Sequence, residues 1–233
     1  MISICGQYIL EKILQQLKEA GIGEVWIVVN HQKEIIRDYF KYGKALGIKI
    51  EYIYQQNLKG IGEAVCLCEK IIDKDPNFLL VYGDVLKATN NFIPLLERFQ
   101  RNSPQTMATI THPLSDGAYG NVYLSHNMKI SKFIEKPEST RLSNYILGGS
   151  FVLDNNCFEF LKNNNYDMVA YYQHQISQNL LEASLWEDDW IDISRPWHIL
   201  AANKMMMKPW KETVIPESVT IDPDVNIRGI VKF

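Results

Sequence analysis

The sequence predicts an α/β protein with a doubly wound, mostly parallel, Rossmann-like sheet, and three observations lead to this prediction. Helical and extended patterns alternate over residues 8–84. The run Phe78-Leu79-Leu80-Val81-Tyr82 is apolar at successive positions, which predicts a strand buried on both faces, as in parallel sheets. Gly83 and Asp84 follow this run directly, at the carboxyl end of the strand, where open α/β sheets bind their ligands.

The first third of the chain alternates regularly between helix and strand patterns. Apolar residues at helical spacing predict helices over residues 8–20, 32–42 and 63–72, and the first two end at Gly21 and Gly43. Continuous or alternating apolar residues predict strands over residues 25–29, 48–54 and 78–82. Because each helix precedes a strand, we expect right-handed crossovers and one doubly wound sheet.

After Asp84 the alternation is less regular. A helix is predicted around residues 93–99 and another near 157–161, with strands over 107–111, 121–124, 130–135 and 145–153. Residues 169–185 predict one helix, residues 190–193 a strand, and residues 196–207 a final helix with an early proline. The mixed strands indicate an added sheet region that receives a second ligand.

The last twenty residues follow a six-residue repeat. One apolar position of the repeat holds Ile215, Ile221, Ile227 and Phe233, and the other holds Val219, Val225 and Val231. This repeat predicts the start of a parallel, left-handed β-helix, with chance alternation as the alternative. A single coil cannot bury its own faces, so we expect part of a larger β-helix or a segment that docks on another surface. We therefore divide the chain into a domain over 1–208 and a β-helix segment over 209–233.

Composition narrows the classes of function. The chain has 233 residues, 46% of them hydrophobic, and a formal net charge of -3, which argues against a nucleic acid held by a basic surface. No run approaches the ~18 consecutive apolar residues of a membrane span, and the first residues do not resemble a signal peptide. The four cysteines lack metal-finger spacing, so we expect reduced cysteines and a cytoplasmic protein.

Five local patterns place glycine, carboxylate or amide side chains at the ends of predicted elements. They are residues 55–64, residues 83–84, residues 117–122 with 133–137, residues 143–149, and residues 190–203. Each pattern has an ordinary structural explanation: a plain glycine turn, an Asx-type turn at Asp84, a solvated Glu135–Lys136 pair, or core packing of Trp190 and Trp197.

The same residues also have functional explanations. Asp84 is placed to hold a divalent metal on a phosphate, and backbone amides before the helix at 63–72 can face a nucleobase or phosphate. Glu135 can accept two sugar hydroxyls, and Lys136 can neutralise a phosphate.

Taken together, the patterns resemble the sugar-1-phosphate nucleotidyltransferase (nucleotide-sugar pyrophosphorylase) family, from about Ile4 to the C-terminus. Gln55 and Gly60 match the family's Gln-x4-Gly-Thr pattern, with Ile61 where threonine is usual. The family's Gly-Asp, Tyr-Gly-x-Val, Glu-Lys-Pro and Ser-Asn-Tyr…Gly patterns match residues 83–84, 119–122, 135–137 and 143–149. Its Trp-x-Asp-x-Gly-x-Pro-Trp…Ala-Asn pattern matches residues 190–203, with Ser194 where glycine is usual.

The resemblance implies a GT-A-like nucleotidyltransferase fold and transfer of a nucleotidyl group from a nucleoside triphosphate to a hexose 1-phosphate, with release of pyrophosphate. Glucose 1-phosphate is the expected sugar, and thymidylyl, uridylyl or adenylyl the expected group. It implies that Asp84 and Asp192 hold Mg²⁺ and, with Lys136, carry the catalysis. The implied nucleotide contacts are Gln55, Gly60 and Gly83, and the implied sugar-phosphate contacts are Gly120, Glu135, Lys136, Asn144 and Gly149.

One departure from the family concerns the triphosphate site. The family opens with a strand, a Gly-x-Gly-Thr-Arg-Leu-x-Pro-Leu-Thr run and a Pro-Lys pair, none of which these 233 residues contain, and Gln7 and Tyr8 stand where Lys-Pro is usual. Three explanations are open: a missing start, a short non-catalytic paralogue that binds sugar phosphate or nucleotide sugar, or a site completed by a partner chain. We expect ligand binding with little turnover, in a homo-oligomer or a hetero-oligomer with a full-length relative.

A GT-A glycosyltransferase is the remaining alternative from the same fold region. It is disfavoured because Asp188 and Asp189 precede Trp190 in a late segment, away from the end of a mid-chain strand.

Overall fold

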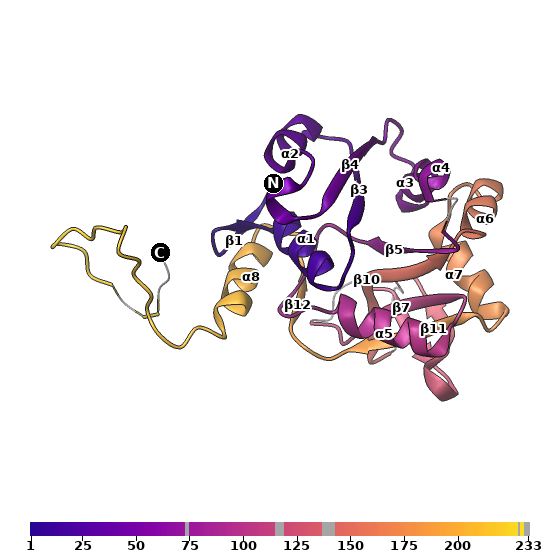
Figure 1. The fold of residues 1–233 in the computed structure, drawn as a ribbon. Helices are drawn as coiled ribbons and strands as arrows, with labels where there is room; N and C mark the ends of the chain where they lie inside the picture. Colours follow the sequence, from indigo (N-terminus) through magenta and orange to yellow (C-terminus); the bar gives the residue numbers. More distant parts are fainter. Residues whose placement is uncertain (73–74, 115–118, 137–142, 228, 231–233) are drawn as a thin grey trace.

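The largest sheet has six strands in the order β11-β7-β10-β8-β9, with β5 beside β10 (Figure 1). The computed structural model describes residues 1–72, 75–114, 119–136, 143–227 and 229–230. β7 and β11 are parallel, whereas β10 is antiparallel to β5, β7 and β8, and β8 is antiparallel to β9. Two further ladders that concern the site are the parallel pair β3–β4 and the antiparallel pair β6–β12.

The elements up to Asn102 are β1 (Ser3–Ile4), β2 (Gln7–Tyr8), α1 (Ile9–Glu19), β3 (Glu24–Val29), α2 (Lys33–Phe40), η1 (Lys44–Leu46), β4 (Lys49–Tyr54), α3 (Ile61–Leu67), α4 (Glu69–Ile72), β5 (Asn77–Val81), β6 (Val85–Lys87) and α5 (Phe92–Asn102). Those after it are β7 (Thr106–Thr111), β8 (Asn121–Leu124), η2 (His126–Met128), β9 (Ile130–Ile134), β10 (Tyr145–Asp154), α6 (Cys157–Asn163), α7 (Met168–Ser177), β11 (Leu181–Trp186), β12 (Trp190–Asp192) and α8 (His198–Met207).

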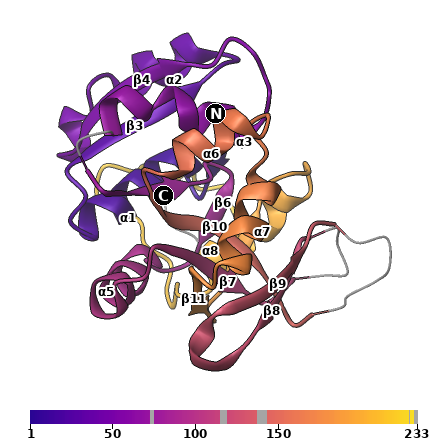
Figure 2. The ribbon, with the colours of Figure 1, turned by 90° about the vertical axis from the view of Figure 1, so that its right-hand side faces the viewer.

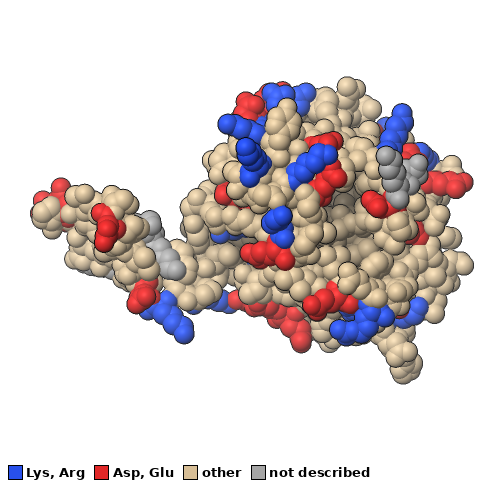
Figure 3. Space-filling model, in the orientation of Figure 1, with Lys and Arg blue, Asp and Glu red and all other residues tan. Residues whose placement is uncertain are grey.

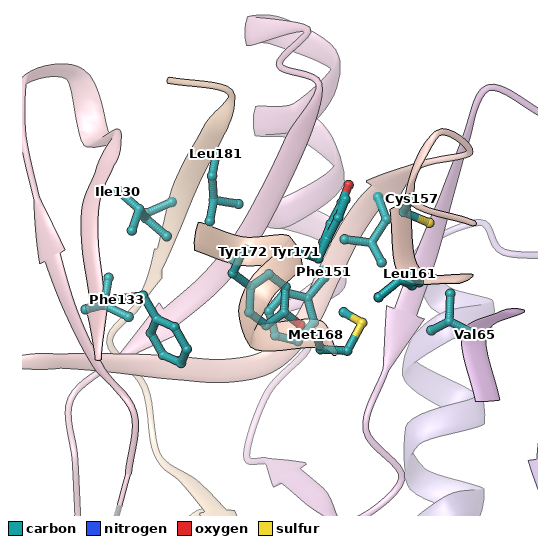
Figure 4. Close-up of a cluster of buried hydrophobic side chains, with 14 of the residues drawn as sticks. Val65, Ile130, Phe133, Phe151, Cys157, Leu161, Met168, Tyr171, Tyr172 and Leu181 are labelled. Carbon is teal, nitrogen blue, oxygen red and sulfur yellow. The ribbon is translucent and has the colours of Figure 1, made fainter. Parts of the chain in front are cut away.

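Three hydrophobic clusters hold the described sheets and helices together, and the smallest, around Leu95, Met107 and Val152, packs α5 on the six-stranded sheet. The two larger clusters concern the site. One lies between the six-stranded sheet and helices α6 and α7, where the rings of Phe151 and Tyr172 stack at 5.2 Å (Figure 4). The other is formed by α1, the β3–β4 ladder and α8, and it also receives Leu79 and Val81 from β5. Among the described residues, no backbone hydrogen bond joins the β3–β4 ladder to β5, so the second cluster connects the two regions by packing.

The predicted α/β class is confirmed, and most predicted elements occur within two residues of their expected bounds. β5 differs from its prediction in two respects. Its residues are only partly buried, and its hydrogen-bonded neighbour, β10, is antiparallel to it. The six-stranded sheet therefore mixes both directions. β8 and β9 extend from the body as a hairpin (Figure 2).

The predicted helix over 169–185 is wrong in its second half. α7 ends at Ser177, and residues 181–186 form β11 beside β7. Asn179 adopts a left-handed conformation with φ of 57°, and Leu180 N–H donates to the Gln175 carbonyl, which closes the helix. Leucine, glutamate and alanine in residues 181–185 favour helices locally, but the free edge of β7 pairs with them instead.

The C-terminal segment extends away from the α/β body (Figure 1). Residues 209–227 and 229–230 contain no helix or strand element, and Val214, Ile215 and Val225 are exposed. Two turns, closed by Val219 N–H to Pro216 O and by Val225 N–H to Asp222 O, lie six residues apart, in step with the repeat. The β-helix stays a prediction, and its last positions, 231–233, lie outside the described residues.

Charge is distributed evenly over the surface that Figure 3 shows. Lysine and arginine side chains alternate there with aspartate and glutamate, and the described residues of this face form no continuous basic area. None of the described helices is both long enough and apolar enough to cross a membrane.

Gly62 fixes the approach of α3 to the turn before α7. A Cβ at this position would lie 2.0 Å from the Tyr166 carbonyl oxygen and 2.7 Å from its carbon, both of them backbone atoms. Only a residue without a side chain fits there, and this contact sets the position of the loop that precedes α3.

We expect Gly62→Ala to lower the free energy of unfolding by about 1–3 kcal/mol, because either α3 or the backbone at Tyr166 must move. Urea denaturation measures this change. Gly23→Ala is the matched control: a Cβ there meets no atom within 4 Å, so the change is expected to stay within about 0.5 kcal/mol. Equal stability of the two variants would contradict the contact.

Candidate functional site

The β6–β12 ladder brings Asp84 and Asp192 together. Asp84 immediately precedes β6, and Asp192 ends β12 opposite Val85. The N–H of Ile193 donates to the Asp84 carbonyl oxygen at 2.9 Å, which extends the pairing past both residues. Two residues that are 108 positions apart in the chain thus occupy neighbouring positions on one ladder, and they are the two that the family resemblance assigns to the metal.

The electrostatics of this pair fit a bound cation. Asp84 is exposed by accessible surface, but its carboxyl is partly desolvated by the surrounding protein atoms, and this desolvation, followed by the charge of Asp192, raises the pKa of Asp84. Asp192 Oδ1 is buried and has no hydrogen-bond partner among the described residues. A buried carboxylate oxygen without a donor is costly, and a divalent cation between the two carboxylates would offset both the burial and the repulsion.

The site would depend on ligand atoms as well as on the protein. In the described part of the chain, no group of three or more His, Cys, Asp or Glu side chains is placed to hold a metal. Two carboxylates are a sufficient protein contribution where substrate phosphate oxygens and water complete the coordination, as is usual for Mg²⁺. Asp84 and Asp192 therefore fit a metal that binds together with a phosphate.

Gln55 and Gly60 lie in a loop that its own side chains hold together. Gln55 Nε2 donates to the Gly60 carbonyl at 3.1 Å and to Glu63 Oε2 at 2.9 Å. The same Glu63 oxygen accepts from Lys59 N–H at 3.1 Å, and Glu63 is only 8% exposed. Gly60, with φ of 92° and ψ of -170°, adopts a conformation open mainly to glycine, directly before α3. The sequence did not indicate Glu63, which orders this loop.

The predicted sugar-phosphate residues come from three places. Gly120 lies directly against the β9 end of the hairpin, because a Cβ on it would come 2.5 Å from the Phe133 ring and 3.0 Å from Glu135 Oε2. Glu135 and Lys136 form an open ion pair at 3.8 Å with side chains 43% and 66% exposed. The charge of Glu135 contributes, after burial, to the raised pKa of Tyr82, which places Glu135 near the end of β5.

Gly149 lies in a bulge of β10 beside β6. The register of β10 on β7 shifts between Leu147 and Phe151, and Gly149 has φ of 75°. Its carbonyl accepts from Tyr82 N–H at 2.9 Å, and a Cβ on it would lie 2.9 Å from Val85 Cγ2. Gly149 is thus held against the residues on either side of Gly83 and Asp84.

The structure therefore brings together four of the predicted site residues, which are Gly83, Asp84, Asp192 and Gly149. Gly120 and Glu135 lie at the hairpin on the side of this group. Asn144 is exposed, and its carbonyl is bonded to His112 Nδ1 at 3.0 Å. Gly117, Ala118 and Pro137, which belong to the sequence patterns, lie outside the described residues.

The two tryptophans of the pattern at residues 190–203 differ in burial. Trp190 is core, as its structural explanation predicted, with 5% exposure and its Nε1 donating to the His112 carbonyl at 2.9 Å. Trp197 is 64% exposed, so core packing was the wrong explanation for it.

Asn203 has a role that the sequence pattern did not specify. Its Oδ1 accepts from Cys5 N–H at 2.8 Å, and its Nδ2 donates to the Ile199 carbonyl at 2.8 Å. Cys5 and Gly6 form a turn with φ of 50° and 80° between β1 and β2. Asn203 therefore links the β1–β2 turn, which precedes α1, to α8.

Curated relatives match over nearly the whole chain. The bifunctional protein GlmU of Methanococcus vannielii is 30% identical over 243 aligned residues, which cover 99% of this chain and 54% of the relative. The low-salt glycan biosynthesis nucleotidyltransferase Agl11 of Haloferax volcanii is 23% identical and is matched over 66% of its length. The chain thus spans about half the length of the GlmU proteins that it matches.

Solved structures show the same fold. A Bacillus anthracis protein described as a glucose-1-phosphate thymidylyltransferase superposes with a TM-score of 0.80, at 18% identity, covering 89% of this chain and 86% of that one. UDP-glucose pyrophosphorylase from Acinetobacter baumanii superposes with a TM-score of 0.75, also at 18% identity, covering 89% and 87%.

The sequence model of the nucleotidyl transferase family matches residues 1–208, which include every element from β1 to α8. Because this match covers most of the chain, the protein belongs to the nucleotidyl transferase family.

Proposed function

We propose that the chain carries a sugar-1-phosphate nucleotidyltransferase site, in which Asp84 and Asp192 bind Mg²⁺ together with the phosphates of a nucleotide or nucleotide sugar. The observation that carries this proposal is the pair of carboxylates: Asp84 has a raised pKa, and Asp192 has a buried oxygen for which the described part of the chain provides no donor. Nucleotidyltransferases of this family generally use divalent metal ions.

The chemistry needs charge neutralisation and alignment more than it needs a nucleophile on the protein. An oxygen of the sugar phosphate attacks the α-phosphorus of the nucleoside triphosphate, the new P–O bond forms in line, and the bond to pyrophosphate breaks. Bound Mg²⁺ supplies charge neutralisation on the phosphate oxygens. Asp84 and Asp192 orient the metal, Lys136 adds positive charge, and Glu135 accepts sugar hydroxyls.

The rest of the site supports the substrate class. Gly83 is exposed directly beside Asp84, and a Cβ there would meet no atom within 4 Å, so a ligand can approach the backbone next to the carboxylates. The exposed Glu135–Lys136 pair supplies polar groups for a sugar phosphate. We propose glucose 1-phosphate as the sugar phosphate because the structural relatives include a glucose-1-phosphate thymidylyltransferase and UDP-glucose pyrophosphorylases.

A second candidate function is a non-catalytic subunit that binds sugar phosphate or nucleotide sugar and assembles with a catalytic relative. Ile61 and Ser194 replace the threonine and glycine that are usual at these positions in the family. The two candidates share the ligand site and differ in turnover. Pyrophosphate release by this polypeptide, measured with and without hexose 1-phosphate, separates them.

Asp84→Asn and Asp192→Asn are each expected to weaken Mg²⁺-dependent binding of UDP-glucose or dTDP-glucose at least about tenfold, because each removes a charged metal ligand. Isothermal titration with and without Mg²⁺ measures the effect. Asp188→Asn is the matched control, since that carboxylate bonds Thr89 Oγ1 at 2.6 Å outside the site. Mg²⁺ dependence that is unchanged in both site variants would refute the metal assignment.

The pH dependence of the stability of the metal-free protein gives an independent check on the interaction between Asp84 and Asp192. The pKa of Asp84 is raised in the folded chain, so the ionised carboxylate destabilises the fold above that pKa and ceases to do so below the unfolded value of ~3.9. Asp84→Asn should therefore stabilise the metal-free protein at pH 7, with the gain lost near about pH 4.

Asp188→Asn should act in the opposite direction at pH 7, because the Thr89 hydrogen bond lowers the pKa of Asp188. Urea denaturation at the two pH values measures both variants. A loss of stability in Asp84→Asn at pH 7 would contradict the repulsion between Asp84 and Asp192.

A further inference from the structure

Lys87 is a buried lysine that the proposed chemistry does not use. It ends β6, is 3% exposed, and donates from Nζ to the Gly148 carbonyl oxygen at 2.6 Å. Among the described residues it forms no ion pair, and burial lowers its pKa to about 7. Burying an amine without a carboxylate partner costs free energy that an apolar side chain would avoid. The hydrogen bond from Lys87 Nζ to Gly148 is therefore the contact that can explain a lysine at this position.

That contact lies on the bulge of β10. Three consecutive residues of the bulge each accept a hydrogen bond from the segment between β5 and α5. Gly148 O accepts from Lys87 Nζ, Gly149 O accepts from Tyr82 N–H at 2.9 Å, and Ser150 Oγ accepts from Asn91 Nδ2 at 3.2 Å. Asn91 is 2% exposed, so both side-chain donors are fully inside the protein.

The same strand adjoins both carboxylates of the proposed metal site, because Asp84 immediately precedes β6 and Asp192 pairs with Val85 from β12. Side chains two positions apart point to one face of a strand, so Val85 and Lys87 both face the bulge. Val85 touches the Gly149 position, and its partner across the ladder is Asp192. β6 therefore has Asp84 immediately before its first residue and a donor to the bulge at its last residue. The position of the bulge relative to the carboxylates depends on this short strand.

We propose that Lys87, together with Asn91, is a positioning residue that holds the β10 bulge against β6 and so fixes the distance between the Asp84–Asp192 pair and the sugar-phosphate subsite at Gly149. This inference rests on the proposed function for its consequence in binding. Its structural part concerns the ligand-free protein alone. The two parts can be tested separately.

The test compares Lys87→Met, which removes the donor and keeps an apolar chain of similar length, with Lys87→Gln, which keeps a donor. Leu86→Met is the matched control, because Leu86 is fully buried in the same strand and its side chain points to the other face. The first measurement is amide hydrogen exchange of residues 147–151 in ligand-free protein. We expect faster exchange in Lys87→Met than in Leu86→Met, with Lys87→Gln between Lys87→Met and the wild type.

The second measurement is the affinity for UDP-glucose or dTDP-glucose in Mg²⁺, with the urea midpoint recorded for each variant. We expect Lys87→Met to bind about tenfold more weakly or worse, while its urea midpoint stays close to that of Leu86→Met. The lost hydrogen bond and the removed desolvation cost act in opposite directions on stability. A purely structural role would move the midpoint and the affinity together, and Lys87→Gln would then not restore binding.

The outcomes separate the two claims. Exchange in Lys87→Met equal to that in Leu86→Met overturns the positioning role, and so does unaltered affinity. If wild-type protein binds no sugar phosphate or nucleotide sugar at all, the proposed function fails, and hydrogen exchange alone decides whether Lys87 holds the bulge. Faster exchange confined to the bulge of Lys87→Met supports the role in either case.

Discussion

The pairing of β6 with β12 is the constraint on which the site depends. Three residue pairs and the Ile193–Asp84 hydrogen bond bring two carboxylates together against their mutual repulsion. The raised pKa of Asp84 and the unpartnered oxygen of Asp192 are the physical cost of this arrangement. Backbone hydrogen bonds and the packing of Leu86 and Ile191 into a hydrophobic cluster offset that cost. Carboxylates perturbed by desolvation and by a neighbouring charge cluster at functional sites.

The surrounding elements keep this ladder in contact with the other parts of the site. Gly149 sits against Val85, the bulge receives hydrogen bonds from Lys87 and Asn91, and Tyr82 joins β5 to β10 immediately before Gly83. The β3–β4 ladder belongs to the same hydrophobic cluster as α1 and α8 but shares no described backbone hydrogen bond with β5. The carboxylate end of the site is therefore tied more firmly to the six-stranded sheet than to the Gln55–Gly60 loop.

The sequence predicted the α/β class and most elements because hydrophobic periodicity is a local feature. The pairing of Asp84 with Asp192 was implied by the family resemblance alone. The sequence-based prediction was wrong where tertiary contacts determine the secondary structure or the strand direction. Residues 181–185 have helix-favouring side chains yet pair with β7, and β5 pairs with a strand whose direction no local pattern encodes. The contacts of Glu63, Lys87 and Asn203 were not predicted, because a charged or amide side chain reveals its burial and partners only in three dimensions. A lysine in an otherwise apolar stretch such as Val85-Leu86-Lys87 was the only local indication of the buried amine.

Crystals of the protein grown with a nucleotide sugar and Mn²⁺ in place of Mg²⁺ test the central claim most directly, through the anomalous difference density of the metal. The account predicts a metal peak within about 2.0–2.3 Å of carboxylate oxygens from both Asp84 and Asp192, with phosphate oxygens completing the coordination. A nucleotide sugar bound without a metal peak between these residues, or a metal held by other side chains, would contradict it.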